Sequence, residues 1–160
     1  MQINIRPKTF VFSRISADGG CGETEKLFAV ISITDEGSDR IGLGECLVTS
    51  ETFDMPGGKI DREGMMQAIA GLVEKALRSD DYTEYLRPYP ALLFALESAM
   101  YDYQKNPLLY DTPFAHSEMG IPVVSEVPEG CVLVRPMLDG GITGAIERIR
   151  DARQEGRQAI

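Results

Sequence analysis

The spacing of hydrophobic residues changes once along this chain, and that change limits the fold more than any other feature. In residues 3–12 and 27–34 the apolar positions partly alternate and β-branched types are common, which is typical of half-buried strands. Residues 35–39 have the composition of a turn, and residues 40–48 read as a third strand. Beyond residue 61 the apolar residues recur at helical spacing. Strands followed by helices predict an α+β fold with a three-stranded antiparallel meander.

Three helices are expected in the middle of the chain. The first follows Asp61, a suitable N-cap, and has an apolar stripe made of Met65, Met66, Ile69, Leu72, Val73, Ala76 and Leu77. A short helical segment at residues 82–86 ends near Pro88, and Pro90 suits the first turn of the next helix. That helix, which extends to Tyr103, is apolar over much of its circumference. We expect it to be the most buried helix.

The last part of the sequence predicts the start of a parallel β/α unit. A linker at 111–120 precedes strand-like segments at 121–127 and 131–138, and a strand begins at 157–160. The helix between them has an apolar stripe made of Ile142, Ala145, Ile146, Ile149 and Ala152. Such a βαβ unit usually needs further neighbours. We therefore expect an open sheet edge and an uncovered helix face, available for self-association or for a missing part of the protein.

Charge and composition restrict the partners and the compartment. Twenty-five acidic residues against 16 basic ones give a net charge of -9, so the protein repels phosphate backbones and anionic lipid. No segment has the roughly 18 apolar residues of a spanning helix, and the N-terminus lacks the layout of a secretory signal. The three cysteines are widely separated and fit neither a disulfide framework nor a CxxC site. We expect a cytoplasmic protein that binds neither nucleic acid nor membrane.

Two long connections are expected to leave the meander from the same end. Residues 16–24 contain three glycines and predict a long, pliable connection instead of a tight hairpin turn. Residues 49–59 contain a Pro-Gly-Gly segment and follow the third strand. Connections of this kind either are merely mobile or form a lid over a ligand. The residues themselves leave both alternatives open.

Gly42 and Gly44, in the segment Ile-Gly-Leu-Gly-Glu-Cys at 41–46, have the spacing that opens a nucleotide-binding loop. A dinucleotide fingerprint requires G-x-G-x-x-G at a strand-to-helix turn. Here Glu45 stands where the phosphate would lie, and the next expected helix begins more than ten residues later. The segment at 56–60 similarly lacks the upstream glycine and the Ser/Thr of a Walker A loop. We reject both phosphate-binding interpretations.

Three other features have residue types that occur in functional sites. The segment at 139–144 would bind an anion at a helix N-terminus, but capping and turn formation explain it equally well. His116, the single histidine, lies in a polar linker without an adjacent nucleophile. Glu97 lies in the apolar helix, where a helix-dipole or salt-bridge role is favoured over a functional one. Residue chemistry alone therefore predicts no catalytic residue and no metal site.

Four motifs together resemble the N-terminal half of enolase-superfamily proteins of the mandelate racemase and muconate lactonizing type. They are IGLGEC at 41–46, RPYPALLFALESAM at 87–100, DTPF at 111–114 and GIPVV at 120–124. The order and spacing of the motifs are most similar to those of the o-succinylbenzoate synthases. Other cap-and-barrel enzymes, namely cycloisomerases and dipeptide epimerases, a stand-alone cap-like binding module and a non-functional remnant remain alternatives.

The resemblance implies two domains with different roles. Residues 1–112 would form an α+β capping domain, and residues 113–160 a linker and the first strand and helix of an incomplete TIM-type barrel. The specificity loops would include Asp18, Gly19, Gly20 and Cys21 in the first and Leu47, Val48 and Thr49 in the second. The family's catalytic lysines and Mg²⁺ ligands lie on barrel strands that these 160 residues do not include. We therefore expect no Mg²⁺ site here, binding of a small carboxylate substrate only with a complete barrel, and no activity from this chain alone.

Overall fold

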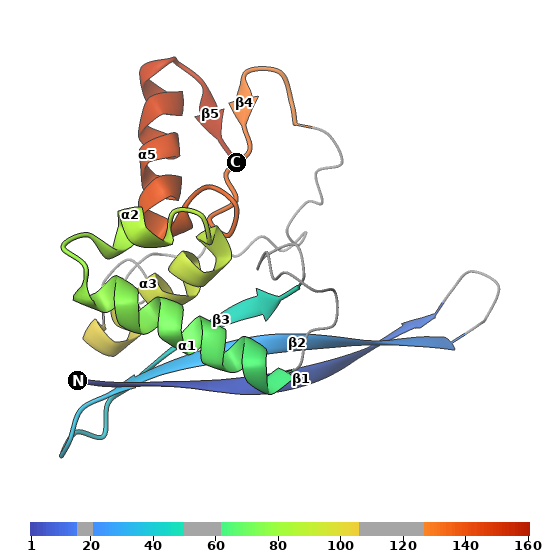
Figure 1. The fold of residues 1–160 in the computed structure, drawn as a ribbon. Helices are drawn as coiled ribbons and strands as arrows, with labels where there is room; N and C mark the ends of the chain where they lie inside the picture. Colours follow the sequence, from blue (N-terminus) through green and yellow to red (C-terminus); the bar gives the residue numbers. More distant parts are fainter. Residues whose placement is uncertain (16–20, 50–61, 106–126) are drawn as a thin grey trace.

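Three strands form one antiparallel sheet in the order β1–β2–β3 (Figure 1). The computed structural model describes residues 1–15, 21–49, 62–105 and 127–160, and its strands are β1 Gln2–Ile15, β2 Cys21–Thr34 and β3 Ile41–Val48. In the register of the sheet, Ile31 of β2 lies between Ile5 of β1 and Gly44 of β3. The predicted three-stranded meander is confirmed.

β1 and β2 are longer than the hydrophobic pattern predicted. Residues 21–24, which were expected in the first long connection, belong to β2 and pair with residues 12–15 of β1. The prediction of a pliable connection is therefore wrong for these four positions, and the remaining residues 16–20 lie outside the described part of the chain. Antiparallel strands are joined by main-chain hydrogen bonds, which do not depend on the type of side chain. The pairing of β1 with β2 therefore continues beyond the residues in which apolar and polar side chains alternate.

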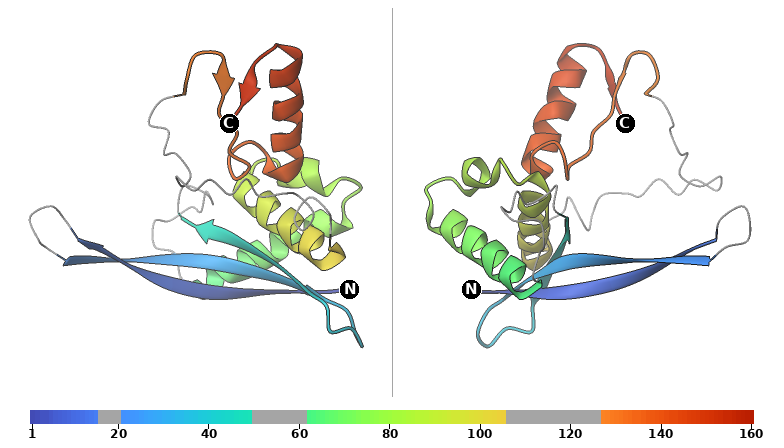
Figure 2. Two further views of the ribbon diagram at one scale, coloured as in Figure 1. Left: turned by 180° about the vertical axis from the view of Figure 1, so that it is seen from behind. Right: turned by 45° about the vertical axis from the view of Figure 1, so that its right-hand side comes forward.

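The β1–β2 pair extends beyond the end of β3. β3 ends at Val48, which lies opposite Leu27, whereas β2 begins six residues earlier at Cys21. At about 3.3 Å per residue the two-stranded ribbon reaches about 20 Å past β3. Figures 1 and 2 show this ribbon projecting away from the helices.

Helices α1 (Arg62–Arg78), α2 (Tyr82–Leu86) and α3 (Pro90–Gln104) follow, and α1 and α3 lie on one face of the sheet (Figure 2). All three helices were predicted, and Pro90 begins α3 as expected. Asp81 caps α2 by accepting hydrogen bonds from the amides of Thr83 and Glu84, while the predicted cap Asp61 is not among the described residues. In the described ranges, no helix has the length and apolar character required to cross a bilayer.

The hydrophobic core lies between the sheet and these helices. α3 has the most buried residues of the described helices, as the sequence predicted. The core is formed by Ala29, Ile31, Ile33, Cys46, Val48, Met65, Met66, Ile69, Val73, Ala76, Leu86, Ala91, Leu92, Leu93, Ala95, Leu96 and Ala99.

β3 and α3 pack backbone against backbone, and the glycine pair makes this possible. A Cβ added at Gly44 would lie 1.9 Å from the carbonyl oxygen of Ala95, and one added at Gly42 would lie 2.1 Å from that of Ala99. Asp102 of α3 also accepts a hydrogen bond of 2.8 Å from the amide of Leu43. The glycines therefore serve close packing within a strand, which agrees with the rejection of a phosphate loop.

The C-terminal residues form a parallel βαβ unit of β4 (Cys131–Val132), α5 (Gly141–Gln154) and β5 (Gln158–Ala159). The predicted helix and final strand are confirmed. The strand predicted at 131–138 is confirmed only for Cys131 and Val132, and the prediction is wrong for the residues beyond them. One strand-like hydrogen bond remains there, from the amide of Val134 to the carbonyl oxygen of Ile160. Pro136 has no amide hydrogen to donate, and the amides of Leu138 and Asp139 turn back to the carbonyl oxygen of Arg135.

Candidate functional site

A cleft lies at the point where β3 stops and β2 continues. Its walls come from the end of β3, the adjacent stretch of β2 and the first residue of α1, and they enclose about 350 Å³. The lining residues are Glu25, Lys26, Leu27, Leu47, Val48, Thr49 and Arg62. We refer to this cavity as the β3-end cleft.

The β3-end cleft contains three of the residues proposed for the specificity loops. Leu47 and Val48 are the last two residues of β3, and Thr49 follows directly. Cys21 is the first residue of β2, about 20 Å along the ribbon from the residue opposite Val48. The structure therefore brings Leu47, Val48 and Thr49 together but leaves Cys21 apart from them. Residues 18–20 lie outside the described part of the chain.

Three charged residues of the β3-end cleft were missed by the sequence analysis. Arg62 places its Nη2 atom 3.1 Å from Oε2 of Glu25, so the start of α1 is joined to β2. Both side chains are about three-fifths exposed, and an ion pair so exposed contributes little to stability. Lys26 adds a second positive charge. Arg62 lies at the start of α1, shortly after the second long connection. This position in the sequence could have identified Arg62 as a residue near the cleft.

Glu97 is buried and holds α5 at its N-terminus. Its carboxylate, on a residue only 1% exposed, accepts hydrogen bonds from the amides of Ile142 and Thr143 and from the Thr143 hydroxyl. Of the two roles predicted for Glu97, helix dipole or salt bridge, these contacts match the first, because the amides at the start of a helix favour a negative charge. These contacts favour capping over binding of an external anion at 139–144.

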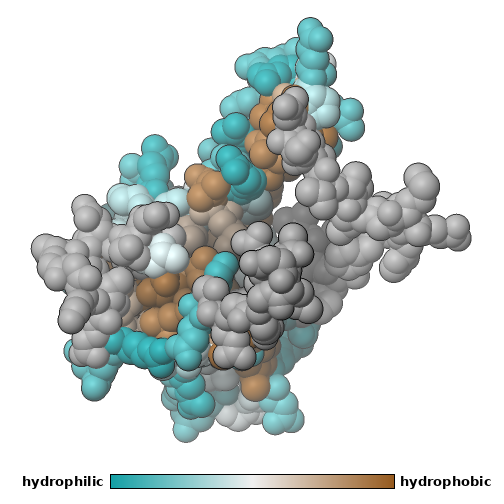
Figure 3. Space-filling view, turned by 90° about the vertical axis from the view of Figure 1, so that its right-hand side faces the viewer, coloured by the Kyte–Doolittle hydropathy of each residue, from teal (hydrophilic) through white to brown (hydrophobic). Residues whose placement is uncertain are grey.

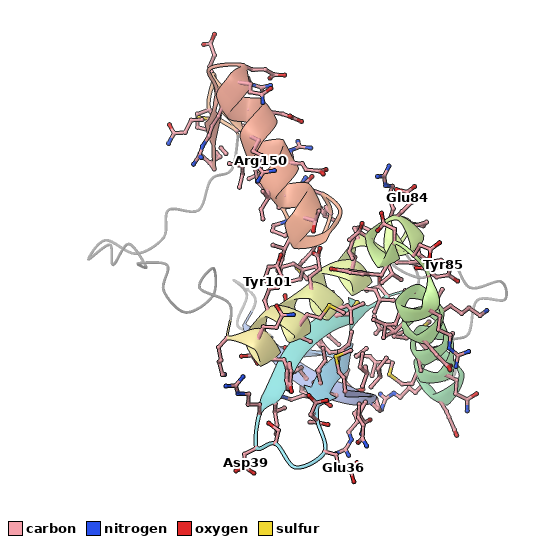
Figure 4. The ribbon with its side chains drawn as sticks, turned by 90° about the vertical axis from the view of Figure 1, so that its left-hand side faces the viewer. Glu36, Asp39, Glu84, Tyr85, Tyr101 and Arg150 are labelled. Carbon is pink, nitrogen blue, oxygen red and sulfur yellow. The ribbon has the colours of Figure 1, made fainter. Side chains whose placement is uncertain are left out.

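Gly141 allows this contact between α3 and α5. It has a φ of +75°, in the left-handed region, and an added Cβ would lie 2.3 Å from Oε2 of Glu97 and 2.8 Å from Cγ of Leu93. Figure 4 shows α5 meeting the other helices at its first turn, with Arg150 further along it and Tyr101 on α3. α3 and α5 are therefore joined by a buried carboxylate and by a close approach that only glycine permits.

A second cavity of about 570 Å³ opens between α2, the start of α3, and α5. Its charged residues include Arg87, Asp139, Glu147, Arg148 and Asp151, and Arg148 is paired with Asp139 at 3.2 Å. Positive and negative groups are mixed here. The cavity contains none of the residues predicted for the specificity loops, so we place the candidate site in the β3-end cleft.

The loop between β4 and α5 faces helices α2 and α3. α5 begins at the end of this loop, against Glu97 and Leu93 of α3, and Leu138 lies with Pro90 in the cavity described above. In parallel β/α folds, ligands bind at the carboxyl ends of the strands, within the loops that lead into the helices. The sheet and its helices thus lie at the end of the βαβ unit where such sites form.

Cys46 is expected to be unreactive in the folded protein. The residue is 0% exposed, and burial raises the pKa of its thiol from 9.0 to about 12. At pH 8 an alkylating reagent should label the partly exposed Cys131 and spare Cys46 until denaturant is added, as read by mass spectrometry of tryptic peptides. Above pH 9 the unfolded chain releases a proton that the folded thiol retains, so stability should fall as the pH rises from 9 toward 12. Equal labelling rates for the two thiols would contradict this assignment.

Several predicted features lie outside the described ranges: His116, residues 56–60, the linker at 111–120 and all but the last residue of the strand predicted at 121–127. Among the residues that the structure describes, no three His, Cys, Asp or Glu side chains are grouped to hold a metal ion. Comparisons of the chain with protein-family models, with curated proteins and with solved structures found no match.

Proposed function

We propose that residues 1–112 are the capping domain, and residues 113–160 the linker and first β/α unit, of a cytoplasmic enolase-superfamily enzyme similar to the o-succinylbenzoate synthases. The reaction would be the Mg²⁺-dependent dehydration of a hydroxycyclohexadiene carboxylate in menaquinone biosynthesis. The proposal rests on the four sequence motifs and on the way in which the two parts meet.

One observation supports the proposal most strongly: the end of the loop that follows β4 and the first turn of α5 lie against α3, the helix that packs on β3. Catalytic sites of β/α barrels form at that end of the strands, so a cap must cover it to act on substrate. The buried Glu97 carboxylate fixes the contact. Figure 3 views the side toward which the ribbon projects, and hydrophobic side chains gather there between the sheet and the βαβ unit.

The residues of this chain would bind and enclose the substrate and would leave the chemistry to the barrel. In this family a Mg²⁺ ion would be held by barrel residues outside these 160 positions, and it would supply the positive charge that favours removal of a proton beside a carboxylate. The β3-end cleft would contact the part of the substrate remote from that centre through Leu47, Val48 and Thr49. Binding energy from such remote contacts lowers the barrier when it orients the reacting atoms.

This placement of the chemistry predicts that the 160-residue chain does not turn over the hydroxycyclohexadiene carboxylate with Mg²⁺. The measurement is formation of the aromatic product, followed by absorbance and by mass spectrometry, with a complete o-succinylbenzoate synthase as the positive control. Measurable turnover by the chain would show that the chemistry has been assigned to the wrong residues.

The same proposal predicts a Lys-x-Lys strand directly after Ile160 in the coding sequence. A protein extended in frame through that strand and the remaining barrel should be active on the hydroxycyclohexadiene carboxylate. Activity restricted to a cycloisomerase or dipeptide epimerase substrate would support the cap-and-barrel assignment and would show that the proposed substrate is wrong. A coding sequence without barrel strands in any frame would overturn the proposal.

A further inference from the structure

The described helices pack against only one of the two faces of the sheet. α1 and α3 cover the face that bears the buried residues of β2 and β3, and Figure 1 shows both helices on that side. The opposite face is formed by the alternate positions of the strands, because successive side chains point to opposite sides. These positions are the even-numbered residues 2–10 of β1, the even-numbered residues 26–34 of β2 and the odd-numbered residues 41–47 of β3. We refer to this surface as the outer face.

The outer face has large apolar side chains where a solvated sheet face would be polar. Ile41 and Leu43 of β3 are each 52% exposed. Phe10 of β1 meets Phe28 of β2 edge to face, with ring centroids 5.2 Å apart, and Val30 is the next outer-face residue of β2. Phe10, Phe28 and Val30 are all partly exposed. An apolar surface that crosses three strands in this way is typical of an interaction site.

The charges of the outer face have opposite signs at its two edges. Arg6 of β1 lies opposite Val30 of β2, and Val30 lies opposite Glu45 of β3. This row across the sheet therefore consists of a cation, an apolar residue and a carboxylate. Glu45 is 4.0 Å from the Nζ atom of Lys8, and both side chains are about half exposed, so its carboxylate can accept further hydrogen bonds. Among the described residues, no ion pair involves Arg6.

A second copy of the chain has the complementary row of charges. When two copies meet outer face to outer face about a two-fold axis parallel to β2, β1 of each copy lies over β3 of the other. Arg6 then lies over Glu45 of the second copy, and the symmetry forms this contact twice. Strands aligned in this way are usual for packed sheets. A two-fold axis across the strands would instead place β1 over β1 and bring the cations Arg6 and Lys8 together.

The edges of the sheet are less suited to association than the outer face. Pro7 of the edge strand β1 has no amide hydrogen to donate to a further strand. On the other edge, the amide of Leu43 in β3 already donates to Asp102 of α3. Proteins protect edge strands by such means. A second copy is therefore expected to pack on the face of the sheet and not to extend it.

We propose that the outer face is a homodimer interface, oriented by two symmetry-related ion pairs between Arg6 and Glu45. Along the eight residues of β3, the three strands have a flat area of about 26 Å by about 14 Å, or about 400 Å² per partner. Stable complexes bury about 800 Å² per partner. The dimer is therefore weak, with a dissociation constant on the order of 10–100 µM. This inference does not depend on the proposed function.

The test is sedimentation equilibrium of the 160-residue chain from about 5 to about 500 µM. The weight-average mass should rise toward that of a dimer over this range. Arg6→Glu and Glu45→Arg should each raise the dissociation constant by about tenfold or more, because each places like charges together at two equivalent contacts. Circular dichroism spectra and urea midpoints check that both variants fold like the unchanged chain.

A mixture of the two variants distinguishes this interface from any other. In a dimer of one Arg6→Glu chain and one Glu45→Arg chain, the two substituted positions face each other with opposite charges. The unsubstituted Arg6 and Glu45 face each other at the second contact. The equimolar mixture should therefore form dimers within about threefold of the original affinity, although neither variant does so alone. A general loss of stability would not be rescued by mixing.

Arg78→Glu is the matched control, because it reverses an exposed cation that lies on α1 and is paired with Glu74, away from the outer face. It should leave the dissociation constant unchanged. The proposal is overturned if the chain remains monomeric up to about 500 µM, if neither reversal weakens the dimer, or if the mixture fails to restore it. Association through the βαβ unit would be insensitive to both reversals and would overturn the proposal in the second of these ways.

Discussion

Gly44→Ala is expected to lower the free energy of unfolding by about 3 kcal/mol or more. The added methyl group would lie 1.9 Å from the carbonyl oxygen of Ala95 and 2.8 Å from its carbonyl carbon. Both are backbone atoms of a buried helix, so relief requires α3 to move away from β3 and opens the core. The measurement is urea unfolding followed by circular dichroism, with the midpoint and slope fitted separately.

Gly71→Ala is the matched control, because it makes the same chemical change in the same fold. Gly71 lies inside α1, and an added Cβ would meet no other atom within 4 Å. Alanine is the better helix former, so this substitution should stabilise the protein by about 0.5–1 kcal/mol. The two substitutions therefore have opposite expected signs. A Gly44→Ala protein within about 0.5 kcal/mol of the unchanged chain would refute the close packing of β3 on α3.

Glu97→Ala is expected to break the contact between α5 and α3, and so to separate the βαβ unit from the sheet and helices α1 to α3. The substitution leaves the partly buried amides of Ile142 and Thr143 and the Thr143 hydroxyl without their acceptor, at a cost of about 2–4 kcal/mol. Hydrogen exchange should show lost protection in α5, β4 and β5, while amides in β2 and β3 remain protected. Uniform loss across all elements would indicate general unfolding in place of separation.

Two further variants make this second test specific. Glu97→Gln retains one oxygen acceptor of the same shape, so it should restore much of the protection of α5 that Glu97→Ala loses. Glu84→Ala removes an exposed carboxylate that is paired with Arg87 at 2.8 Å, and its effect should stay below about 0.5 kcal/mol. Loss of α5 protection in Glu84→Ala would show that the effect is not specific to the buried carboxylate.

The sequence was informative where one face of an element is buried. The three strands of the sheet, the apolar stripe of α1 and the burial of α3 all follow from the spacing of apolar residues, because that spacing repeats with the period of the element. It failed for 21–24, where polar and glycine residues extend an antiparallel ladder, and for 133–138, where apolar residues precede the turns into α5. In both places main-chain hydrogen bonds determined the structure.

The candidate site was only partly predictable, for a related reason. Leu47, Val48 and Thr49 were identified by the resemblance, and the structure places all three in the β3-end cleft. Glu25 and Arg62 are 37 residues apart in sequence and form an ion pair only because β2 continues past the end of β3 and α1 begins beside it. The role of Glu97 was anticipated in kind, but its partner could not be, because the contact joins elements 45 residues apart.

The glycines of β3 also have a consequence for strand pairing. Side chains of a strand alternate between faces, so a shift of one residue between β2 and β3 would turn Ile41 and Leu43 toward α3. A shift of two residues would keep the same face but place Arg40 or Cys46 at one of the two points where α3 has no room for a Cβ. Only the observed pairing puts a glycine at both points. The two residues that first resembled a phosphate loop thus select one alignment of the sheet and exclude its nearest competitors.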